Sequence, residues 1–226
     1  MLFDIDGTLL HGASSSHLAA LAEAVRRVIG RRPQLHVDDD GYRVDGICVA
    51  GMVDPQIIGL MLTSVGAEPD PVVVRRITTL SGPCYREQIE AGAPSGSPLP
   101  GARELVGDLT AAGVTVGVAT GNVRRIAVAK LTANGFGGAF RVGAFGDGHR
   151  DRDSMVAEGC AHAERDEEVW VVGDTPADAA AARANGARVL AVTTGGFGVA
   201  DLADADVVVA QLDDPIVREV LLSPAG

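Results

Sequence analysis

The sequence predicts an α/β protein whose core is a parallel sheet covered by helices on both faces. Beyond residue 101, apolar runs of roughly four to six residues alternate with stretches of helical periodicity, which is typical of buried parallel strands. The chain before residue 92 lacks this alternation, and a segment rich in Gly, Pro and Ser at 92–101 separates the two parts. A length of 226 residues leaves room for one or two domains, and 46% hydrophobic residues indicate a globular chain.

The expected sheet has six strands, each a short apolar run. They are expected at 1–5, 114–119, 140–142, 169–172, 188–192 and, as an edge strand, 207–209. The connecting helices are expected at 102–112, 123–134, 153–164 and 176–185. Ligands of such sheets bind beyond the carboxyl ends of the strands, so the residues directly after each run are the candidates for a site.

Three further helices are expected in the first part of the chain, each opened by capping residues. The second and third begin with an Asp-Pro pair, which places an acid at the N-cap and proline at the first helical position. The helices run from Ser14–Ser16 to Gly30, from Asp54-Pro55 to Gly66 and from Asp70-Pro71 to about Ala91. Residues 31–50 are mixed, with an acidic turn at 38–41.

The chain is acidic, with 19 Lys and Arg against 30 Asp and Glu and a net charge of −11. An acidic chain without basic clusters is unsuited to nucleic acid or to an anionic membrane, and no apolar run reaches the roughly 18 residues of a membrane span. The isolated Cys48, Cys84 and Cys160 fit a reducing compartment, and an acid at the fourth position argues against a signal peptide. We therefore expect a cytoplasmic protein with no nucleic-acid or membrane partner.

The basic residues are unevenly divided, since eighteen are arginines and Lys130 is the only lysine. Because Lys130 follows Ala129, no Gly-Lys-Ser/Thr phosphate loop exists, and neither a His-Glu-x-x-His pair nor a Gly-x-Ser-x-Gly elbow occurs. The remaining histidines and acids without an obvious motif are expected to be structural, capping or surface residues. These are His11, His17, His36 and His162, and the group His149, Asp147, Asp151 and Asp153.

Polar residues follow three of the expected strands. Asp4 and Asp6 follow the first, Thr120-Gly121-Asn122 follow the second, and Asp174 and Asp178 follow the fourth. Carboxylates within about 4 Å of one another repel by roughly 4 kcal/mol at an effective dielectric near 20, so a cation must hold them together. Carboxylate and hydroxyl oxygens are hard ligands, which favours Mg²⁺, with Mn²⁺ as the alternative.

Each of these residues also has an ordinary structural interpretation. Asp174 and Asp178 could cap the helix that begins near 176, and Thr120 could stand in a plain turn. Asp4 is harder to explain in this way, because an acid inside an apolar strand costs several kcal/mol, of order 2–7, unless it is paired. The joint arrangement at three strand ends favours a functional site.

Four segments resemble the four motifs of the haloacid dehalogenase superfamily, in the order and spacing of its phosphoglycolate-phosphatase-like members. They are Asp4-Ile5-Asp6-Gly7-Thr8-Leu9, Ala119-Thr120-Gly121-Asn122, Lys130, and Gly173-Asp174 with Asp178. The resemblance spans nearly the whole chain. It implies a Rossmann-like core from 1–12 and 98–226, with a small helical cap domain at 13–97 inserted after the first strand. It also implies one helical turn and a small flap just after Thr8.

The resemblance implies a role for each motif residue. Asp4 would attack phosphorus and Asp6 would act as general acid and base, with a protonated Asp6 limiting the negative charge of the site. Thr120 and the amides of Gly121 and Asn122 would bind phosphoryl oxygens, and Lys130 would be the cation facing nucleophile and phosphate. Mg²⁺ would be held by Asp4, the Asp6 carbonyl oxygen and Asp174, with Asp178 among these ligands or just behind them.

The resulting functional prediction is a Mg²⁺-dependent phosphatase that acts on a small phosphorylated metabolite, for instance 2-phosphoglycolate, through an aspartyl-phosphate. A phosphomutase of the β-phosphoglucomutase type and an inorganic pyrophosphatase are enzymatic alternatives, and a phosphorylatable signalling or binding module is the non-enzymatic one. Asp6 argues against carbon–halogen cleavage, because the resemblance implies that the dehalogenase branch lacks an acid there. The expected partner is a small-molecule phosphoester, and the expected assembly is a monomer or homodimer.

The cap is expected to select the substrate. Caps of this type often carry a polar or basic residue where Gly51-Met52-Val53-Asp54 enters the second cap helix. Met52 and Val53 are apolar, which disfavours a highly charged second group on the substrate.

Overall fold

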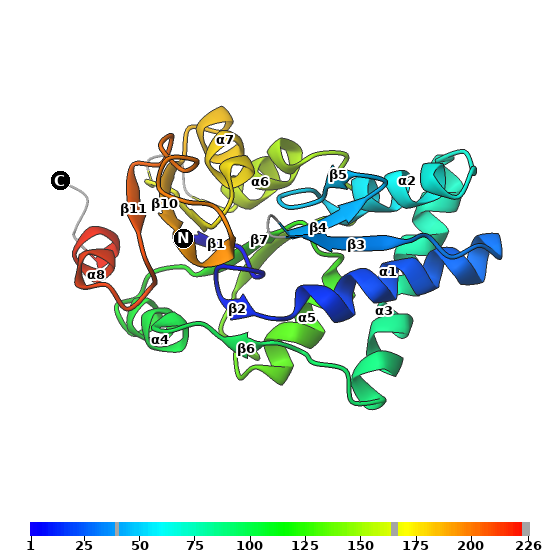
Figure 1. The fold of residues 1–226 in the computed structure, drawn as a ribbon. Helices are drawn as coiled ribbons and strands as arrows, with labels where there is room; N and C mark the ends of the chain where they lie inside the picture. The colour runs from blue at the N-terminus through cyan, green and yellow to red at the C-terminus, as the bar shows by residue number, and fades with distance from the viewer. Residues whose placement is uncertain (39–40, 164–166, 223–226) are drawn as a thin grey trace.

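A computed structural model describes residues 1–38, 41–163 and 167–222 and confirms the predicted α/β fold (Figure 1). Six parallel strands form one sheet in the order β11-β10-β9-β1-β7-β8. The strands are β1 Leu2–Phe3, β7 Gly117–Thr120, β8 Val142–Phe145, β9 Trp170–Gly173, β10 Arg188–Val192 and β11 Val207–Val209. The first strand is shorter than expected, and β8 lies slightly beyond the run predicted at 140–142.

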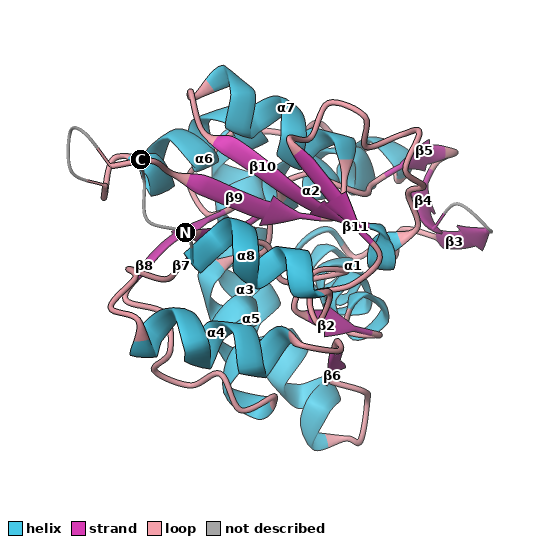
Figure 2. Ribbon diagram, turned by 90° about the vertical axis from the view of Figure 1, so that its left-hand side faces the viewer, coloured by secondary structure: helices cyan, strands magenta, loops and turns pink. Residues whose placement is uncertain are grey.

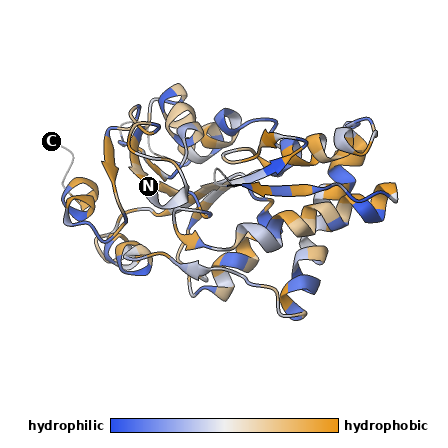
Figure 3. Ribbon diagram, in the orientation of Figure 1, coloured by the Kyte–Doolittle hydropathy of each residue, from blue (hydrophilic) through white to orange (hydrophobic). Residues whose placement is uncertain are grey.

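Helices cover both faces of the sheet, as Figure 2 shows. Successive residues of a strand point to opposite faces, so Phe3 joins one apolar cluster and Leu2 joins another. The cluster around Phe3 is covered by α4 (Ala102–Ala111), α5 (Arg124–Ala133) and α8 (Pro215–Leu222), and the cluster around Leu2 by α6 (Arg152–Cys160) and α7 (Pro176–Ala184). The sequence does not predict α8. Strands β10 and β11 are coloured almost wholly hydrophobic in Figure 3, as strands buried between two helical layers should be.

The first part of the chain forms three helices and a small antiparallel sheet. The helices are α1 (Ser14–Ile29), α2 (Asp54–Ser64) and α3 (Pro71–Glu90), and they share an apolar cluster of their own. The sheet is β3 (Leu35–Asp38), β4 (Gly41–Val44) and β5 (Ile47–Cys48), which occupies the stretch expected to be mixed. The insertion is therefore not purely helical. Part of the predicted acidic turn, at 39–40, lies outside the described residues, and the division into a core and a cap at 13–97 stays a prediction.

Helix ends follow the sequence signals at two places and depart from them at a third. Helix α1 ends at Gly30, whose φ of 80° is the left-handed conformation that glycine adopts most easily. Asp70 caps α3 by accepting hydrogen bonds from the N–H groups of Val72 and Val73. The expectation that Asp54 caps α2 is wrong: Val53 is the N-cap, and Asp54 is the first helical residue with its side chain engaged elsewhere.

The chain turns tightly between β1 and the insertion. The N–H groups of Leu9 and Leu10 both donate to the carbonyl oxygen of Ile5, which closes one turn after the first acidic motif. Strand β2 (Leu10–His11) then pairs with β6 (Ser97–Pro98), so the start and the end of the insertion lie side by side. A 3₁₀ turn, η1 (Thr193–Gly195), follows β10. Among the residues that the structure describes, no helix combines the length and apolarity that crossing a bilayer requires.

Candidate active site

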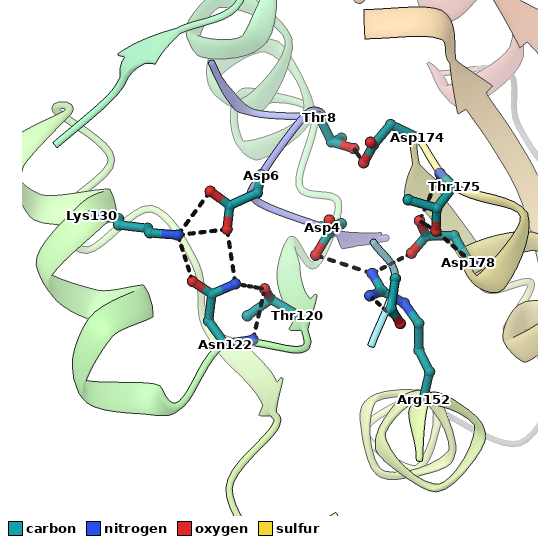
Figure 4. Close-up of polar contacts among 11 residues, drawn as sticks. Asp4, Asp6, Thr8, Thr120, Asn122, Lys130, Arg152, Asp174, Thr175 and Asp178 are labelled. Atoms are coloured by element: carbon teal, nitrogen blue, oxygen red, sulfur yellow. Dashed lines mark hydrogen bonds and ion pairs between the residues drawn. The ribbon is translucent and has the colours of Figure 1, made fainter. Parts of the chain in front are cut away.

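The carboxyl ends of three neighbouring strands bring the predicted polar residues together (Figure 4). Strand β1 lies between β7 and β9, so Asp4 stands between Thr120 at the end of β7 and Asp174 after β9. The N–H of Asp4 donates to the carbonyl oxygen of Val172 at 2.9 Å, which continues the β1–β9 ladder up to the acid. The ends of these three strands therefore lie next to one another at one edge of the sheet.

Three carboxylates form a compact buried cluster. One oxygen each from Asp4, Asp174 and Asp178 lies within 4.8 Å of the others. Burial raises the pKa of Asp4 to about 7, against the opposing charge of Arg152. Burial and the carboxylates of Asp4 and Asp178 raise the pKa of Asp174 well above its ordinary value. The cluster therefore carries an excess of negative charge that favours a bound cation.

Hydroxyl groups and close glycines fix two of these acids. Thr8 donates from Oγ1 to Asp174 at 3.0 Å, and a side chain at Gly195 would collide with the Asp174 carboxylate. Asp178 accepts hydrogen bonds from the N–H of Thr175 at 3.0 Å and from its hydroxyl at 2.7 Å. Asp178 thus belongs to a capping box at the start of α7, in which Thr175 is the N-cap, and it also faces the cluster, whereas Asp174 does not cap the helix.

Arg152 is the cation that contacts Asp4, and the sequence analysis misses it. Its Nη2 lies 3.1 Å from Asp4 Oδ1 and donates to Asp178 Oδ1, while Nη1 donates to the carbonyl oxygen of Gly51 at 3.2 Å. Although burial opposes the charged form, the carboxylates around it raise the pKa of Arg152. Composition does not single out Arg152, because it is one of eighteen arginines. The one sequence feature that could have indicated a role in the site is its position at the start of the helix that follows β8.

Lys130 departs from the expectation that it faces the nucleophile. Its ammonium, on a side chain with no exposed surface, donates to both oxygens of Asp6 at 2.8 and 2.6 Å and to Asn122 Oδ1 at 2.7 Å. Lys130 lies two turns into α5, and from there its side chain reaches Asp6. Arg152, and not Lys130, lies beside Asp4. Burial raises the pKa of Asp6, but Lys130 leads the opposing charges and the net pKa is lowered. The lowered pKa favours an ionised Asp6, and the expected proton on Asp6 stays a prediction for the complex with substrate.

Thr120, Gly121 and Asn122 lie at the end of β7, on the Asp6 side of the site. Asn122 Nδ2 donates to Thr120 Oγ1 at 3.0 Å and to Asp6 Oδ2 at 2.9 Å, which links the two motifs. The carbonyl oxygen of Gly121 accepts from the N–H of Asp54 at 2.8 Å, so this turn also holds the insertion.

His17, expected to be a structural or surface residue, is buried and paired with an acid of the insertion. Its Nε2 lies 2.9 and 3.0 Å from the two carboxylate oxygens of Asp54, and both side chains are buried. Asp54 Oδ2 also accepts from the N–H of Val123, the N-cap of α5, at 2.7 Å. The pair therefore joins α1, α2 and α5, and no spacing in the sequence signals it.

A cavity of about 530 Å³ lies over the acid cluster. One wall carries strand-end residues such as Asp4, Asp6 and Asp174, and the opposite wall carries residues of the insertion such as His17 and Tyr42. The cavity gives a small molecule access to Asp4.

Comparison with known proteins decides the family. The haloacid dehalogenase-like hydrolase model matches residues 1–186. The chain belongs to the haloacid dehalogenase-like hydrolases. Phosphoglycolate phosphatases from two strains of Cereibacter sphaeroides are each 30% identical to it over 200 residues, covering 86% of this chain and 85% of theirs. The chain is thus an enzyme of the phosphatase type within this superfamily.

Solved structures share the fold of this hydrolase. A mutant of CbbY from Rhodobacter sphaeroides, in complex with xylulose-(1,5)bisphosphate, aligns with a TM-score of 0.69 at 18% identity, covering 94% of each chain. The β-phosphoglucomutase of Clostridium difficile aligns with a TM-score of 0.68 at 15% identity, covering 98% of this chain and 96% of that one. At these identities the likeness concerns the fold alone.

The acid cluster of this hydrolase suits a divalent cation. Asp4, Asp174 and Asp178 offer three carboxylate oxygens at one point, all on residues no more than 5% exposed. Oxygen donors of this charge are what Mg²⁺ requires, and Mg²⁺ is usually held by one or two carboxylates together with phosphate and water. The cluster therefore has the chemistry of a magnesium site.

Proposed function

We propose that this hydrolase cleaves small phosphate monoesters in a Mg²⁺-dependent reaction through an aspartyl-phosphate on Asp4. The observation that carries the proposal is the setting of Asp4: a carboxylate at the end of β1, held by Arg152 and open to the cavity. An anionic nucleophile attacks an anionic ester only where positive charge offsets the repulsion. Arg152 supplies such charge, since its Nη2 lies 3.1 Å from Asp4 Oδ1 and the residue lines the cavity.

In the first step an oxygen of Asp4 bonds to phosphorus while the bond from phosphorus to the leaving oxygen breaks. The leaving oxygen takes a proton from Asp6, so Asp6 must be protonated at that moment. Lys130 keeps Asp6 ionised in the free enzyme, and the negative charge of the arriving phosphoryl group raises the pKa of Asp6 again. Lys130 and Asn122 meanwhile hold the carboxyl in place.

In the second step Asp6 takes a proton from a water molecule, whose oxygen attacks phosphorus and releases Asp4 and phosphate. The Thr120 hydroxyl, whose oxygen already accepts from Asn122, still has its proton to donate to a phosphoryl oxygen. The amides of Gly121 and Asn122 complete this binding. Mg²⁺, held by Asp4, Asp174 and the Asp6 carbonyl oxygen with Asp178 beside them, supplies charge stabilisation for the phosphoryl group.

The test is Asp4→Asn, which keeps shape but removes the nucleophile. Hydrolysis of p-nitrophenyl phosphate in Mg²⁺ should fall by roughly a thousand-fold or more, and the mass increment of a trapped phosphoenzyme should disappear. Asp213→Asn, at an exposed aspartate, is the matched control and should leave both unchanged. Substantial residual turnover of Asp4→Asn, purified free of host phosphatases, would rule out the mechanism.

The relatives named phosphoglycolate phosphatase make 2-phosphoglycolate the first natural monoester to assay. The same assay separates the alternatives. A phosphomutase would require a bisphosphate activator and return an isomeric sugar phosphate, a pyrophosphatase would act on pyrophosphate, and a signalling module would show no sustained turnover.

A further inference from the structure

The cavity wall opposite Asp4 has a chemical character of its own. We infer that the leaving group of the substrate is uncharged, hydroxyl-bearing and about the size of a sugar, and that it is not a small carboxylate. The inference rests on the proposed phosphatase function and concerns only the leaving group that the insertion side of the cavity accepts. It follows from the charge, the polar groups and the volume of the cavity.

Among the described residues, no lysine or arginine lies on the insertion side of the cavity, whose lining bases there are the histidines His11 and His17. Among the described residues that line it, Arg152 is the only arginine and none is a lysine. Arg152 belongs to the core, and its two terminal nitrogens already contact Asp4, Asp178 and the carbonyl oxygen of Gly51. A second anionic group on the substrate would therefore meet no free lysine or arginine on this wall, and the exposed imidazole of His11 is the one base there besides His17 among the described lining residues.

His17 does not supply the missing charge. Its Nε2 contacts both oxygens of Asp54, which is itself 1% exposed and lines the same cavity. If His17 is protonated, the pair is neutral, and if His17 is neutral, the pair is negative. A negative His17–Asp54 pair repels a carboxylate, and a neutral pair does not attract one. In both states the pair can form hydrogen bonds with a hydroxyl group.

The acids of the cavity act in the same direction. Asp4, Asp6 and Asp174 line it together with Asp54, and a carboxylate close to the scissile bond would approach all of them. Seen from the opposite wall, Mg²⁺ and a dianionic phosphoryl group together carry no net charge, so they do not reverse this balance there, although the phosphoryl oxygens still act on the nearby Asp6. An uncharged leaving group avoids the repulsion.

The remaining lining suits a hydroxylated carbon skeleton. Ser14, Ser15 and Tyr42 offer neutral donors and acceptors, and Leu18 and Ile57 offer apolar surface for C–H groups. At about 30 Å³ for a water-sized group, 530 Å³ holds about 18 such groups. A hexose monophosphate fits within this space and occupies more of it than a two-carbon phosphoester does.

Matched substrates test the inference. 2-Hydroxyethyl phosphate and 2-phosphoglycolate share the same two-carbon skeleton and differ in an alcohol against a carboxylate. We expect kcat/KM to be about ten-fold higher for the alcohol, and higher again for a hexose or pentitol monophosphate. A preference for 2-phosphoglycolate would overturn the inference and point to the N–H groups at the start of α1 as a carboxylate site.

A charge placed on the wall gives the reverse test. Ser15→Lys adds a cation at an exposed lining position, and Ser15→Gln is its neutral, long-chain control. Ser15→Lys should raise the ratio of kcat/KM for 2-phosphoglycolate to that for 2-hydroxyethyl phosphate by about five-fold or more, and Ser15→Gln should leave the ratio unchanged. An unchanged ratio in Ser15→Lys would contradict the inference.

p-Nitrophenyl phosphate distinguishes the two proposals. If the wild-type enzyme hydrolyses it but prefers carboxylated natural substrates, only the inference about the leaving group fails. If the folded enzyme hydrolyses no phosphoester in Mg²⁺, the proposed function fails and the inference falls with it.

Discussion

Two buried cations are divided between the two acids of the first motif. Arg152 contacts Asp4, and Lys130 contacts Asp6. The two tasks suit the two side chains, because a planar guanidinium can bridge Asp4 and Asp178 at once, whereas a compact ammonium can lie between both oxygens of Asp6 and Asn122. Composition draws attention to the single lysine and gives no sign of the arginine that contacts Asp4.

Arg152→Met should remove charge from the nucleophile without emptying its space. We expect kcat for p-nitrophenyl phosphate to fall by about 10²–10³, because Asp4 and Asp178 then repel each other and the phosphoryl group loses a donor. Arg150→Met is the control, since Arg150 lies two residues away with its side chain 92% exposed, and it should keep wild-type kcat. Equal activity in the two variants would exclude Arg152 from the site.

Lys130→Met should destabilise the protein because it leaves the Asp6 carboxylate without its main partner. Removing one member of a buried ion pair costs about 3–5 kcal/mol, and the 18% exposure of the Asp6 side chain places the expected loss of unfolding free energy at the lower end. The double variant Lys130→Met/Asp6→Asn should recover part of it, as measured by urea unfolding. If Asp6→Asn gives no recovery in that background, the ion pair is not the source of the loss.

At the scale of elements, the segment 51–54 docks the insertion on the core. The N–H of Asp54 donates to the carbonyl oxygen of Gly121, and the carbonyl oxygen of Gly51 accepts from Arg152. A Cβ at Gly121 would collide with the carbonyl oxygen of Met52, so this approach requires glycine. The insertion is thus connected to the core by one backbone hydrogen bond and to Asp4 through the side chain of Arg152.

Gly121→Ala should push the segment 51–54 away from the end of β7. We expect a loss of about 1–3 kcal/mol in unfolding free energy together with a raised KM, because the substrate wall moves relative to Asp4. Gly107→Ala, in the interior of α4 with open space around it, is the control and should be neutral or stabilising by up to about 1 kcal/mol. A Gly121→Ala variant that behaves like this control would show that the docking tolerates displacement.

Elements with a strong local signal are the ones that the sequence predicts. Apolar runs bounded by turns locate β7, β9, β10 and β11, and Gly30 and Asp70 mark helix ends through local conformation and capping. Strands β3 to β5 escape prediction because they are short, and β3 alternates apolar and polar residues over only four positions. Asp54 was assigned a local cap because an Asp-Pro pair usually provides one, but tertiary contacts with His17 and Val123 outweighed it.

At the scale of the whole molecule, chain order and strand order together build the candidate site. The sequence places Asp4, Thr120 and Asp174 after strands, and the parallel sheet brings those strands to adjacent positions. Contacts between residues far apart in sequence, such as Arg152 with Gly51, depend on how the insertion folds back over the sheet. The spacing of residues in the sequence does not contain that information, so the residues on the insertion side of the cavity could not be predicted from it.

The acid cluster makes the stability of the whole fold depend on pH and metal. Folding raises the pKa of Asp4 from 3.8 to about 7 and that of Asp174 well above 3.8. Between these values the folded chain binds more protons than the unfolded chain, so the cluster costs stability as pH rises from about 4 to about 7. A divalent cation that binds the ionised acids should reverse this cost.

Asp174→Asn should therefore be more stable than the wild-type protein in EDTA at pH 8, and this advantage should shrink at pH 5, where the acid is protonated. Mg²⁺ at about a hundred times its Kd should raise the unfolding free energy of the wild type by about 2.7 kcal/mol and that of Asp174→Asn by much less. Thermal unfolding with EDTA or Mg²⁺ at pH 5 and pH 8 measures the stability difference between the two proteins at each pH and the Mg²⁺ response of each protein. Asp213→Asn is the control and should follow the wild type. An Asp174→Asn variant that is destabilised equally at both pH values, or that keeps the full Mg²⁺ response, would show that Asp174 neither suffers the repulsion nor binds the ion.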